Sequence, residues 1–434
     1  MIRLTFDRNR TNLQGTVHLP ASKSIAARAL VLHHLASKEP AQDNIPNLPE
    51  CDDTRVIRRA LTDASANGTI NIEGAGTAMR FLTALFVCQP GSDIILTGNN
   101  RMQQRPIGTL VEALRELGAD ISYEGKEGFP PLHIRGKELS GDSLTMDGSI
   151  SSQYISAMLM ITPLIKPASE GNPPFRLTLE GKIVSAPYID MTCALMEHYG
   201  IEVAWEEETG SLIVPRGSYV DKSLTIEGDW SAASYWYAMQ TLAMKLYIPY
   251  SVKLEGLTYT DCIQGDSICV ELLDPQLLMC GEISIDCSDT PDLIPTLAVA
   301  YFLLDTPFRI YGAENLRIKE TDRIDALAYE LGKLGCALKV ESRNWNDKAE
   351  EILIWDGTKN EAYDNGKCAR ISTYGDHRMA MSFAPAVLRF GQIEIEHPEV
   401  VNKSYPAFWD DLKSVGIGID ILPDTEANPS ENEP

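Results

Sequence analysis

Six segments of helical length, each largely apolar beyond its first turn, most constrain how this chain can fold. They are SKSIAARALVLHHLA from Ser22, AGTAMRFLTALFV from Ala75, SISSQYISAMLMITPLI from Ser149, DWSAASYWYAMQTLA from Asp229, DTPDLIPTLAVAYFLL from Asp289 and YGDHRMAMSFAPAVL from Tyr374. A helix that is apolar on nearly all sides has no face suited to water and must be buried. The fold must therefore enclose helices within other elements.

A second, amphipathic kind of helix recurs between these segments and ends in a glycine followed by a strand pattern. Examples are PIGTLVEALRELGADISY, PYIDMTCALMEHYGIEVAW, DRIDALAYELGKLGCALKV and AFWDDLKSVGIGIDI. Such a glycine supplies the left-handed cap that ends a helix. Strands are predicted at GTVHL, DIILTG, LTLEG, LIVP, LTIEG, SVKLEG, ISID, FRIYG and IEIEH,. Each unit thus combines strands with one buried and one surface helix.

These units predict an α/β (α+β) protein with three units in each half. The 434 residues are enough for two cores,. A doubly wound sheet has the same periodicity. The absence of GxGxxG and GxxxxGK[ST] motifs after a strand argues against that alternative,.

Charge and composition exclude several classes of partner. The 38 Lys and Arg residues against 61 Asp and Glu give a net charge of −23, which opposes binding to nucleic acid or to an anionic membrane,. The longest apolar run, Tyr154–Ile165, is too short to span a bilayer,. Nine scattered cysteines without a CxxC pair, and no signal-peptide pattern at the start, favour a cytoplasmic protein,. Residues 424–434 are expected to form a disordered acidic tail.

Basic residues gather at the predicted helix starts, where unpaired N–H groups and the helix dipole attract anions. They are Lys23, Arg28, Arg80, Arg105, Lys319, Arg323, Arg378 and Lys403. The serines at these starts have a structural alternative as helix caps. Lys319 and Arg323 form a repulsive i,i+4 pair that an anion between them would relieve. The cluster predicts a pocket for more than one phosphate or carboxylate.

Two acids are candidates for proton transfer, Asp292 after Pro291 and Glu320 beside Lys319,. Their structural alternatives are a helix cap and a surface ion pair. His377 is either a donor or a packed ring. The sequence has no metal-binding histidine spacing and no GxSxG motif, so we expect neither a metal nor a cofactor,.

LPASKSIAAR resembles the LPxSKSxxxR signature of the 5-enolpyruvylshikimate-3-phosphate synthase family. The resemblance continues in order through GAGTAMR, RMQQRPIG, DGSISSQ, SAPYID, EGDWSAASY, TPD, ENLRIKETDR, YGDHRMAM and VNKSYP. It implies a two-domain inside-out α/β barrel, with three βαβαββ repeats and interior helices in each domain. The domains would be 20–227, and 1–19 plus 228–423. The substrates would occupy the cleft between them.

The resemblance implies transfer of the enolpyruvyl group of phosphoenolpyruvate to the 5-hydroxyl of shikimate 3-phosphate, in the shikimate pathway of aromatic amino acid biosynthesis. Shikimate 3-phosphate would be held by Lys23, Ser24, Arg28, Ser151, Ser152, Gln153, Ser185, Tyr188, Asp292, Asn315 and Lys319. Phosphoenolpyruvate would be held by Lys23, Gly76, Arg105, Gln153, Arg323, Arg378 and Lys403. Asp292 would be the base for the hydroxyl, and Glu320 with Lys23 would handle the C3 proton.

The sequence departs from the family pattern at Gly74, commonly Asn, and at Phe81, commonly Pro. Both lie near the site at which the herbicide glyphosate competes in the family. The rival within the fold is a UDP-N-acetylglucosamine enolpyruvyl transferase, which carries a reactive Cys where this chain has RMQQRPIG. A non-catalytic anion-binding relative is the other alternative. We expect a monomer whose only partners are the two small substrates and whose cleft closes when they bind.

Overall fold

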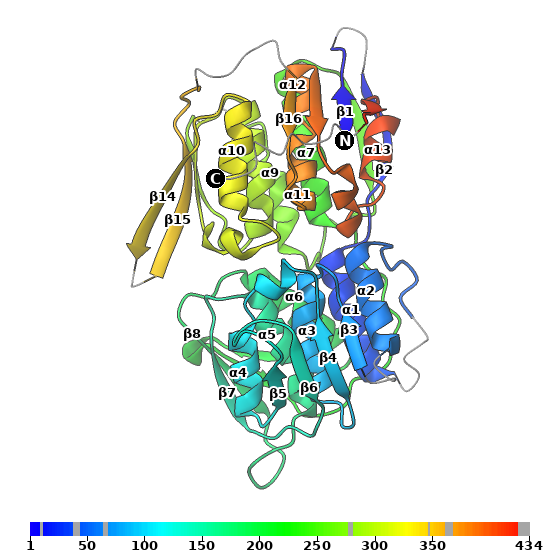
Figure 1. Ribbon diagram of the computed structural model, residues 1–434, viewed down its shortest axis with the longest axis vertical. Coiled ribbons are helices and arrows are strands. Elements are labelled where there is room, and N and C mark those ends of the chain that lie inside the picture. The colour runs from blue at the N-terminus through cyan, green and yellow to red at the C-terminus, as the bar shows by residue number, and fades with distance from the viewer. Residues whose placement is uncertain are drawn as a thin grey trace.

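The structure is a computed structural model that describes residues 1–8, 12–37, 44–63, 68–276, 281–345, 348–360 and 368–423. The expected acidic tail, 424–434, lies outside the described residues. Figure 1 shows two lobes, one above the other. One hydrophobic core, which defines the first lobe, is built from residues between Ile25 and Ile226. The core of the second lobe combines residues between Ile2 and Leu19 with residues between Trp230 and Ile417.

The first lobe contains six helices and eight strands among its described residues. The helices are α1 (Lys23–Ala36), α2 (Asp52–Asp63), α3 (Gly76–Val87), α4 (Gly108–Glu116), α5 (Ser152–Ile161) and α6 (Ala186–His198), with the 3-10 turns η2 (Met102–Gln104), η3 (Thr162–Leu164) and η4 (Glu207–Thr209). The strands are β3 (Gly68–Asn71), β4 (Asp93–Thr97), β5 (Asp120–Tyr123), β6 (Leu132–Arg135), β7 (Ser143–Asp147), β8 (Phe175–Glu180), β9 (Ala204–Glu206) and β10 (Ser211–Val214).

The second lobe is assembled from both ends of the described chain. Its helices are α7 (Trp230–Lys245), α8 (Cys269–Leu272), α9 (Ile294–Leu303), α10 (Arg323–Lys333), α11 (His377–Phe383), α12 (Ala386–Phe390) and α13 (Phe408–Ser414), with η5 (Gly265–Ile268), η7 (Pro291–Leu293), η8 (Glu314–Ile318) and η9 (Pro398–Lys403). Its strands are β1 (Ile2–Thr5), β2 (Leu13–His18), β11 (Tyr250–Glu255), β12 (Ile283–Asp286), β13 (Phe308–Tyr311), β14 (Lys339–Trp345), β15 (Lys348–Trp355), β16 (Ala369–Ile371), β17 (Gln392–Ile395) and β18 (Gly418–Ile421).

Four sheets share one strand order, in which two parallel strands are followed by two antiparallel ones. The orders are β3-β4-β6-β5, β7-β8-β10-β9, β12-β13-β15-β14 and β16-β17-β1-β18. In the last sheet the N-terminal strand β1 takes the position that the final strand of the unit takes elsewhere, with Leu4 opposite Ile393. In each of these units a buried helix links the parallel pair, as the apolar segments predict.

The other two units are reduced. The unit built on α7 has only the two-stranded parallel sheet of β2 and β11. The predicted strand at 224–228 is wrong except for one bridge at Gly228. The backbone of this segment pairs with a side chain instead of a strand, because the amide of Asn47 donates to the carbonyl of Ile226 and accepts from the N–H of Ile226. That exchange replaces a ladder of strand pairing.

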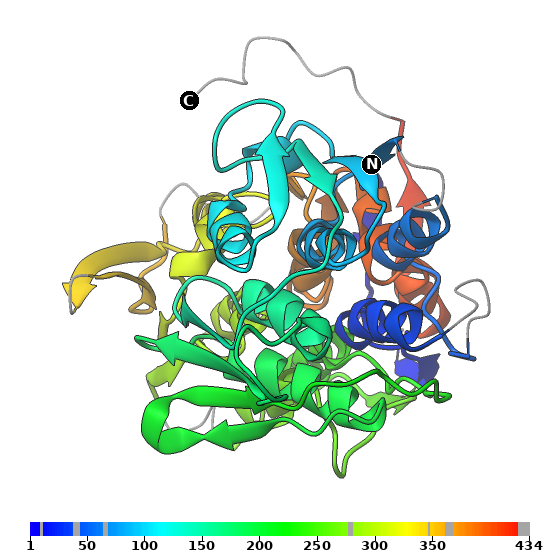
Figure 2. The ribbon, with the colours of Figure 1, turned by 90° about the horizontal axis from the view of Figure 1, so that it is seen from below.

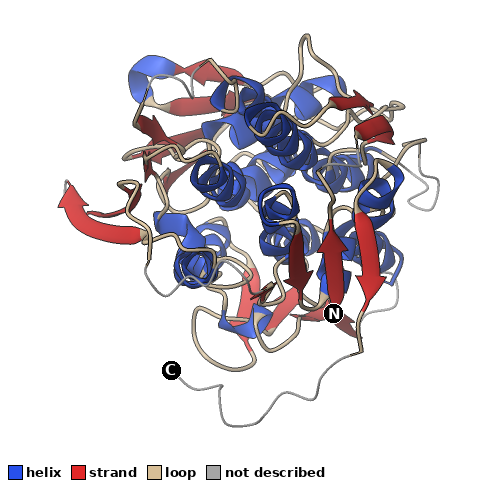
Figure 3. Ribbon diagram, turned by 90° about the horizontal axis from the view of Figure 1, so that it is seen from above, coloured by secondary structure: helices blue, strands red, loops and turns tan. Residues whose placement is uncertain are grey.

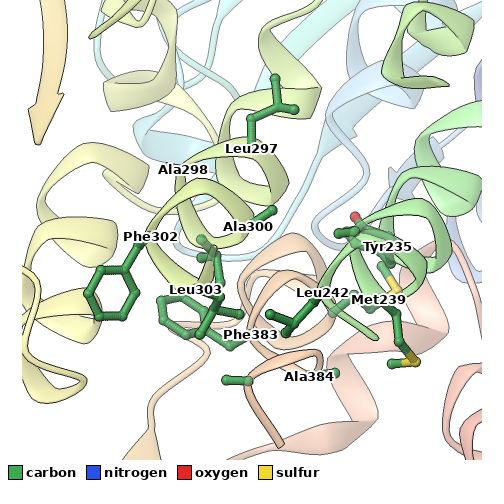
Figure 4. Packing of buried hydrophobic residues seen from close by; sticks show 14 of the residues in the cluster. Tyr235, Met239, Leu242, Leu297, Ala298, Ala300, Phe302, Leu303, Phe383 and Ala384 are labelled. Carbon is green, nitrogen blue, oxygen red and sulfur yellow. The ribbon is translucent and has the colours of Figure 1, made fainter. Parts of the chain in front are cut away.

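The apolar helices lie inside the lobes with strands around them (Figures 2 and 3). Every residue of α9 is buried, and α5 is buried throughout except at Gln153. In the second lobe, α7, α9 and α11 pack side by side through residues such as Leu242, Leu303 and Phe383 (Figure 4). Within the described residues, none of the helices is both long and apolar enough to cross a membrane.

Two neighbouring chain segments connect the lobes. Ala21 and Gly228 form an antiparallel bridge. The N–H of Ser22 donates to the carbonyl of Glu227 over 2.8 Å, and the N–H of Asp229 donates to the carbonyl of Pro20 over 2.8 Å. A side chain at Gly228 would meet the carbonyl oxygen of Gly256 at 2.7 Å, so this crossing requires glycine,. Helices α1 and α7 start directly after this crossing, which brings their N-termini to the boundary between the lobes.

Candidate active site

The starts of several helices from both lobes meet at one cleft between the lobes. Its lining combines α1, α3, α5 and α6 of the first lobe with η7, η8, α10 and α11 of the second. The cleft encloses about 980 Å³, including the part open to solvent. The predicted gathering of basic helix starts is therefore a single place in the structure.

Arg28 lies on the first-lobe side and has only neutral partners. Its guanidinium donates to the hydroxyl of Thr192 over 2.7 Å, to the hydroxyl of Ser156 over 3.0 Å, and to the carbonyls of Ser24 and Tyr188. The side chain is 1% exposed. Burial lowers the pKa of Arg28 to about 10. No carboxylate compensates its charge among the described contacts, so this guanidinium is prepared for an anionic ligand.

Arg80 and Arg105 flank Gly76 at the start of α3. A side chain at Gly76 would meet a guanidinium nitrogen of Arg105 at 2.5 Å and one of Arg80 at 2.7 Å. Helix α3 begins without a side-chain cap, which leaves its first N–H groups facing the cleft,. Burial, and next the charge of Arg105, lowers the pKa of Arg80 to about 10. The two guanidiniums and the helix start together concentrate positive charge of the kind that attracts a phosphate or carboxylate.

Asp292, at the start of α9, is surrounded by cations of the second lobe. Its carboxylate lies 2.8 Å from Arg378, 3.1 Å from Arg323 and 3.5 Å from Nζ of Lys319. Burial favours its protonation, but the charges of Arg378, Lys319 and Arg323 outweigh burial and hold the pKa of Asp292 well below its ordinary value. The carboxylate is thus ionised, and it relieves the repulsion between Lys319 and Arg323 that the sequence suggested.

Glu320 is the second ionised acid of the cleft. Its carboxylate accepts from Lys403 over 2.7 Å and from Arg323 over 2.9 Å, and it lies 3.8 Å from Arg105. Burial alone would raise the pKa of Glu320, but Lys403, Arg323 and Arg105 bring it well below its ordinary value. Arg323 is also held by Asp376 over 2.6 Å, so one guanidinium orders three carboxylates.

Lys23 and His377 complete the charge pattern of the cleft. Nζ of Lys23 lies 3.2 Å from the buried carboxylate of Asp53. Burial lowers the pKa of Lys23, but Asp53 together with Glu320 and other neighbours more than offsets that effect, so the pKa of Lys23 is raised. Burial and the neighbouring charges of Lys23 and Arg378 hold the pKa of His377 well below its ordinary value. The imidazole is therefore neutral among cations.

The cleft brings together all the residues that the sequence predicted for it except Lys403, which reaches it through Glu320. Lys403 also donates to the carbonyl of Gly74 across the lobe boundary over 3.2 Å. Ser185 has a left-handed backbone, with φ of 57°, and its N–H donates to Ser288 of the second lobe over 2.9 Å. Gln153 donates to Thr77 over 3.3 Å.

Sequence reasoning missed Asp53 and the pairing of Asp376 with Arg323. Asp53 lies in the first turn of α2, where acidic residues are ordinary, so its pattern carries no signal for an active site,. Asp376 caps α11 as its position suggests, and it also pairs with Arg323. Ser22, Ser151 and Asp229 likewise cap their helices, so the structural alternative for these starts is correct and coexists with the cleft.

The family model described as EPSP synthase (3-phosphoshikimate 1-carboxyvinyltransferase) matches residues 8–67 and 57–412. The chain belongs to the EPSP synthase family. It is 44% identical over 427 residues to the 3-phosphoshikimate 1-carboxyvinyltransferase of Bacteroides fragilis (strain YCH46), covering 95% of this chain and 97% of that protein.

More distant members of the EPSP synthase family match over nearly the same span. The 3-phosphoshikimate 1-carboxyvinyltransferase of Haemophilus influenzae (strain ATCC 51907 / DSM 11121 / KW20 / Rd) is 34% identical over 445 residues, which cover 93% of this chain and 96% of that protein. The solved EPSP synthase of Acinetobacter baumannii superposes with a TM-score of 0.68 at 19% identity, covering 97% of this chain and 100% of that one. This likeness shows the same mixed helix and sheet fold.

Both positions that depart from the family pattern lie beside the cleft. Phe81 is fully buried, and its ring lies 5.2 Å from the guanidinium carbon of Arg28. That contact stabilises a buried cation by its attraction to the ring face. Gly74 contributes the carbonyl that accepts from Lys403, and a side chain there would meet the amide nitrogen of Asn99 at 3.1 Å. Asn99 thus occupies the space beside Gly74.

Proposed function

We propose that this protein transfers the enolpyruvyl group of phosphoenolpyruvate to the 5-hydroxyl of shikimate 3-phosphate and releases phosphate. The observation that carries the proposal is the cleft itself, in which two ionised carboxylates lie among basic helix starts from both lobes of an EPSP synthase family member. Both substrates are anions, and the cations supply their binding energy.

In this proposal shikimate 3-phosphate lies against the first lobe. Arg28, with Lys23, Ser24 and the α5 start at Ser151, Ser152 and Gln153, takes this substrate, and Ser185, Tyr188, Asn315 and Lys319 enclose it. Phosphoenolpyruvate takes the neighbouring space at Gly76, Arg105, Arg323, Arg378 and Lys403. The support for this division is that Arg28 has neutral partners, whereas the second-lobe cations already face acids.

In the proposed reaction the oxygen of the 5-hydroxyl bonds to C2 of phosphoenolpyruvate, and C3 takes up a proton. The intermediate then loses a proton from C3 as the bond from C2 to the phosphate oxygen breaks. Asp292 accepts the hydroxyl proton, and Glu320 with Lys23 carries the C3 proton. Arg378 and Arg323 stabilise charge on the departing phosphate.

Substrate binding prepares both acids for these steps. In the cleft without ligands, cations hold the pKa of Asp292 and that of Glu320 low, which makes each a weak base. Anionic substrates compensate the same cations. Their binding therefore raises both pKa values toward those needed for proton transfer.

We propose two inside-out barrel domains, 20–227 and 1–19 plus 228–423, each with three units. Two of the six units are reduced. The two hydrophobic cores and the crossing at Gly228 support these boundaries. The domains close on the substrates, and the protein acts as a cytoplasmic monomer. The cysteines that the structure describes are free thiols, which fits a reducing compartment,.

Phosphate release tests the function directly. The purified protein should release phosphate only when phosphoenolpyruvate and shikimate 3-phosphate are both present, and the product should carry the enolpyruvyl ether. UDP-N-acetylglucosamine, offered with phosphoenolpyruvate, tests the rival transferase. Release with that acceptor alone, or binding of both anions without turnover, would contradict the proposal.

A further inference from the structure

We propose that Arg101, outside the cleft, is a positioning residue that places Glu320 for proton transfer when the two lobes come together. Its guanidinium donates through Nε to the carbonyl of Glu320 over 3.1 Å and through Nη2 to the carbonyl of Lys319 over 3.0 Å. Arg101 belongs to the first lobe and the two carbonyls to the second. The inference rests on the proposed function, because Glu320 is its target.

The planar fork of an arginine suits two neighbouring acceptors and fixes their orientation. Lys319 and Glu320 lie between the 3-10 turn η8 and the first turn of α10. This short link has no helical hydrogen bonds of its own to hold its carbonyls. The two bonds from Arg101 therefore act directly on the backbone from which both functional side chains project.

Arg101 is itself carried by a rigid turn. The N–H of Gln103 donates to the carbonyl of Asn99 over 3.0 Å, and the side chain of Asn99 accepts from the N–H of Met102 over 2.9 Å. Met102 is 1% exposed and anchors the turn in the first core. A guanidinium on such a base can transmit the position of the first lobe to its partner.

Contacts from both lobes converge on Glu320. Arg101 holds its carbonyl, and Arg105 from the same turn approaches its carboxylate at 3.8 Å. Lys403 bonds the carboxylate and reaches across to Gly74. Separation of the lobes would remove the contacts from Arg101, Arg105 and Gly74 together. Glu320 thus has its full set of partners only when the cleft is closed.

A second contact between the lobes supplies a matched comparison. On another part of the boundary, Nζ of Lys182 donates to the hydroxyl of Ser288 over 2.8 Å and lies 3.4 Å from the carboxylate of Asp286. Lys182 is exposed, as Arg101 is, but the residues that it binds carry no part of the proposed chemistry. Both side chains favour closure, and only Arg101 acts on Glu320.

The experiment compares steady-state kinetics of Arg101→Met, Arg101→Lys, Lys182→Met and the surface control Arg343→Met with the unaltered protein. Arg101→Met should lower kcat about 10-fold because two charged hydrogen bonds are lost from the closed form. Arg101→Lys should recover part of that loss, since an ammonium keeps the charge and can donate to these carbonyls but lacks the planar fork that fixes both at once. Lys182→Met should change KM for shikimate 3-phosphate while kcat stays within about 2-fold. Arg343→Met should leave both constants unchanged.

A double-mutant cycle with Glu320→Gln separates positioning from general support. If Arg101 acts through Glu320, Arg101→Met should cost less than about 2-fold in kcat when Glu320→Gln is already present. A full 10-fold loss in that background, an unchanged kcat for Arg101→Met, or equal kinetics of Arg101→Met and Lys182→Met would overturn the inference. Absence of turnover by the unaltered protein would instead contradict the proposed function.

Discussion

Buried arginines on the two sides of the cleft have opposite kinds of partner. On the first-lobe side, Arg28 is bonded only to hydroxyl and carbonyl oxygens. On the second-lobe side, Arg323 and Arg378 contact Asp292, and Arg323 also contacts Asp376. Burial lowers the pKa of Arg28 to about 10. The pKa of Arg378 is raised despite burial because Asp292 stabilises its charged form.

This difference separates binding from chemistry. A buried guanidinium with neutral partners gains most when an anion arrives, because that anion is its first opposite charge. A guanidinium already paired with carboxylates gains less, but it keeps those carboxylates ionised and oriented. We therefore expect changes on the first-lobe side to act mainly on substrate affinity and changes on the second-lobe side to act mainly on turnover or stability.

Asp292→Asn is the strongest test of this separation. The amide keeps the size of the side chain but cannot accept the hydroxyl proton, so kcat should fall about 1000-fold. Calorimetric titration should give an affinity for shikimate 3-phosphate within a few-fold of that of the unaltered protein. A kcat near the normal value would remove Asp292 from the role of base. A large loss of affinity would place it with the binding residues instead.

Arg323→Met and Arg28→Met form the second test, measured as free energies of unfolding in urea. Arg323→Met leaves the buried carboxylate of Asp376 without its 2.6 Å partner and should destabilise the protein by about 3 kcal/mol,. Arg28→Met leaves only neutral hydroxyls and carbonyls without a donor and should cost about 1–2 kcal/mol. Equal losses, or a larger loss for Arg28→Met, would break the comparison between the two sides.

Much of the fold could be predicted because the strongest signals are local. The six apolar segments can only be interior helices, and the glycine caps mark where the surface helices end. The predictions that fail concern contacts between residues distant in sequence. The segment at 224–228 has the alternation of a strand, yet Asn47, far away in sequence, takes its backbone hydrogen bonds. The pairing of β1 with β17 also depends on contacts that no local pattern can indicate.

The candidate site divides in the same way. Basic residues at helix starts carry a signal because cations are uncommon there and few in this acidic chain. The second-lobe acids carry little signal, since Asp376 is also an ordinary helix cap. That Asp292 contacts three cations follows only from the convergence of η7, the start of α10 with the residues just before it, and α11. The roles expected for Asp292 and Glu320 came from the resemblance to a family and not from the residue pattern.

Gly76→Ala should sharpen the comparison within the first lobe. The added methyl group would meet guanidinium nitrogens of Arg105 and Arg80 at 2.5 and 2.7 Å, and both are ends of flexible side chains that can shift. We expect KM for phosphoenolpyruvate to rise about 10-fold, equivalent to about 1.4 kcal/mol, with little change in kcat or in the unfolding free energy. A loss confined to kcat would show that Gly76 serves the chemical step rather than affinity.

The smallest effect concerns His377, the neutral ring among the cations of the cleft. Its folded pKa lies well below the ordinary value because of burial and the charges of Lys23 and Arg378. As pH falls, the unfolded chain therefore takes up this proton first, and stability is lost below the unfolded pKa of about 6.5. Between pH 7.5 and 5.5 this group should remove about 1 kcal/mol from the unfolding free energy.

His377→Asn should abolish that part of the pH dependence, so urea unfolding of the variant should weaken less between pH 7.5 and 5.5 than that of the unaltered protein. His18→Asn, at an exposed position on β2, is the control for substituting a histidine outside the cleft. The unaltered protein and His377→Asn share every other ionisable group, so the difference between their pH dependences isolates His377. An identical pH dependence in all three would mean that the cations around His377 do not keep its ring neutral, and the electrostatic contrast between the two sides would be smaller than their contacts indicate.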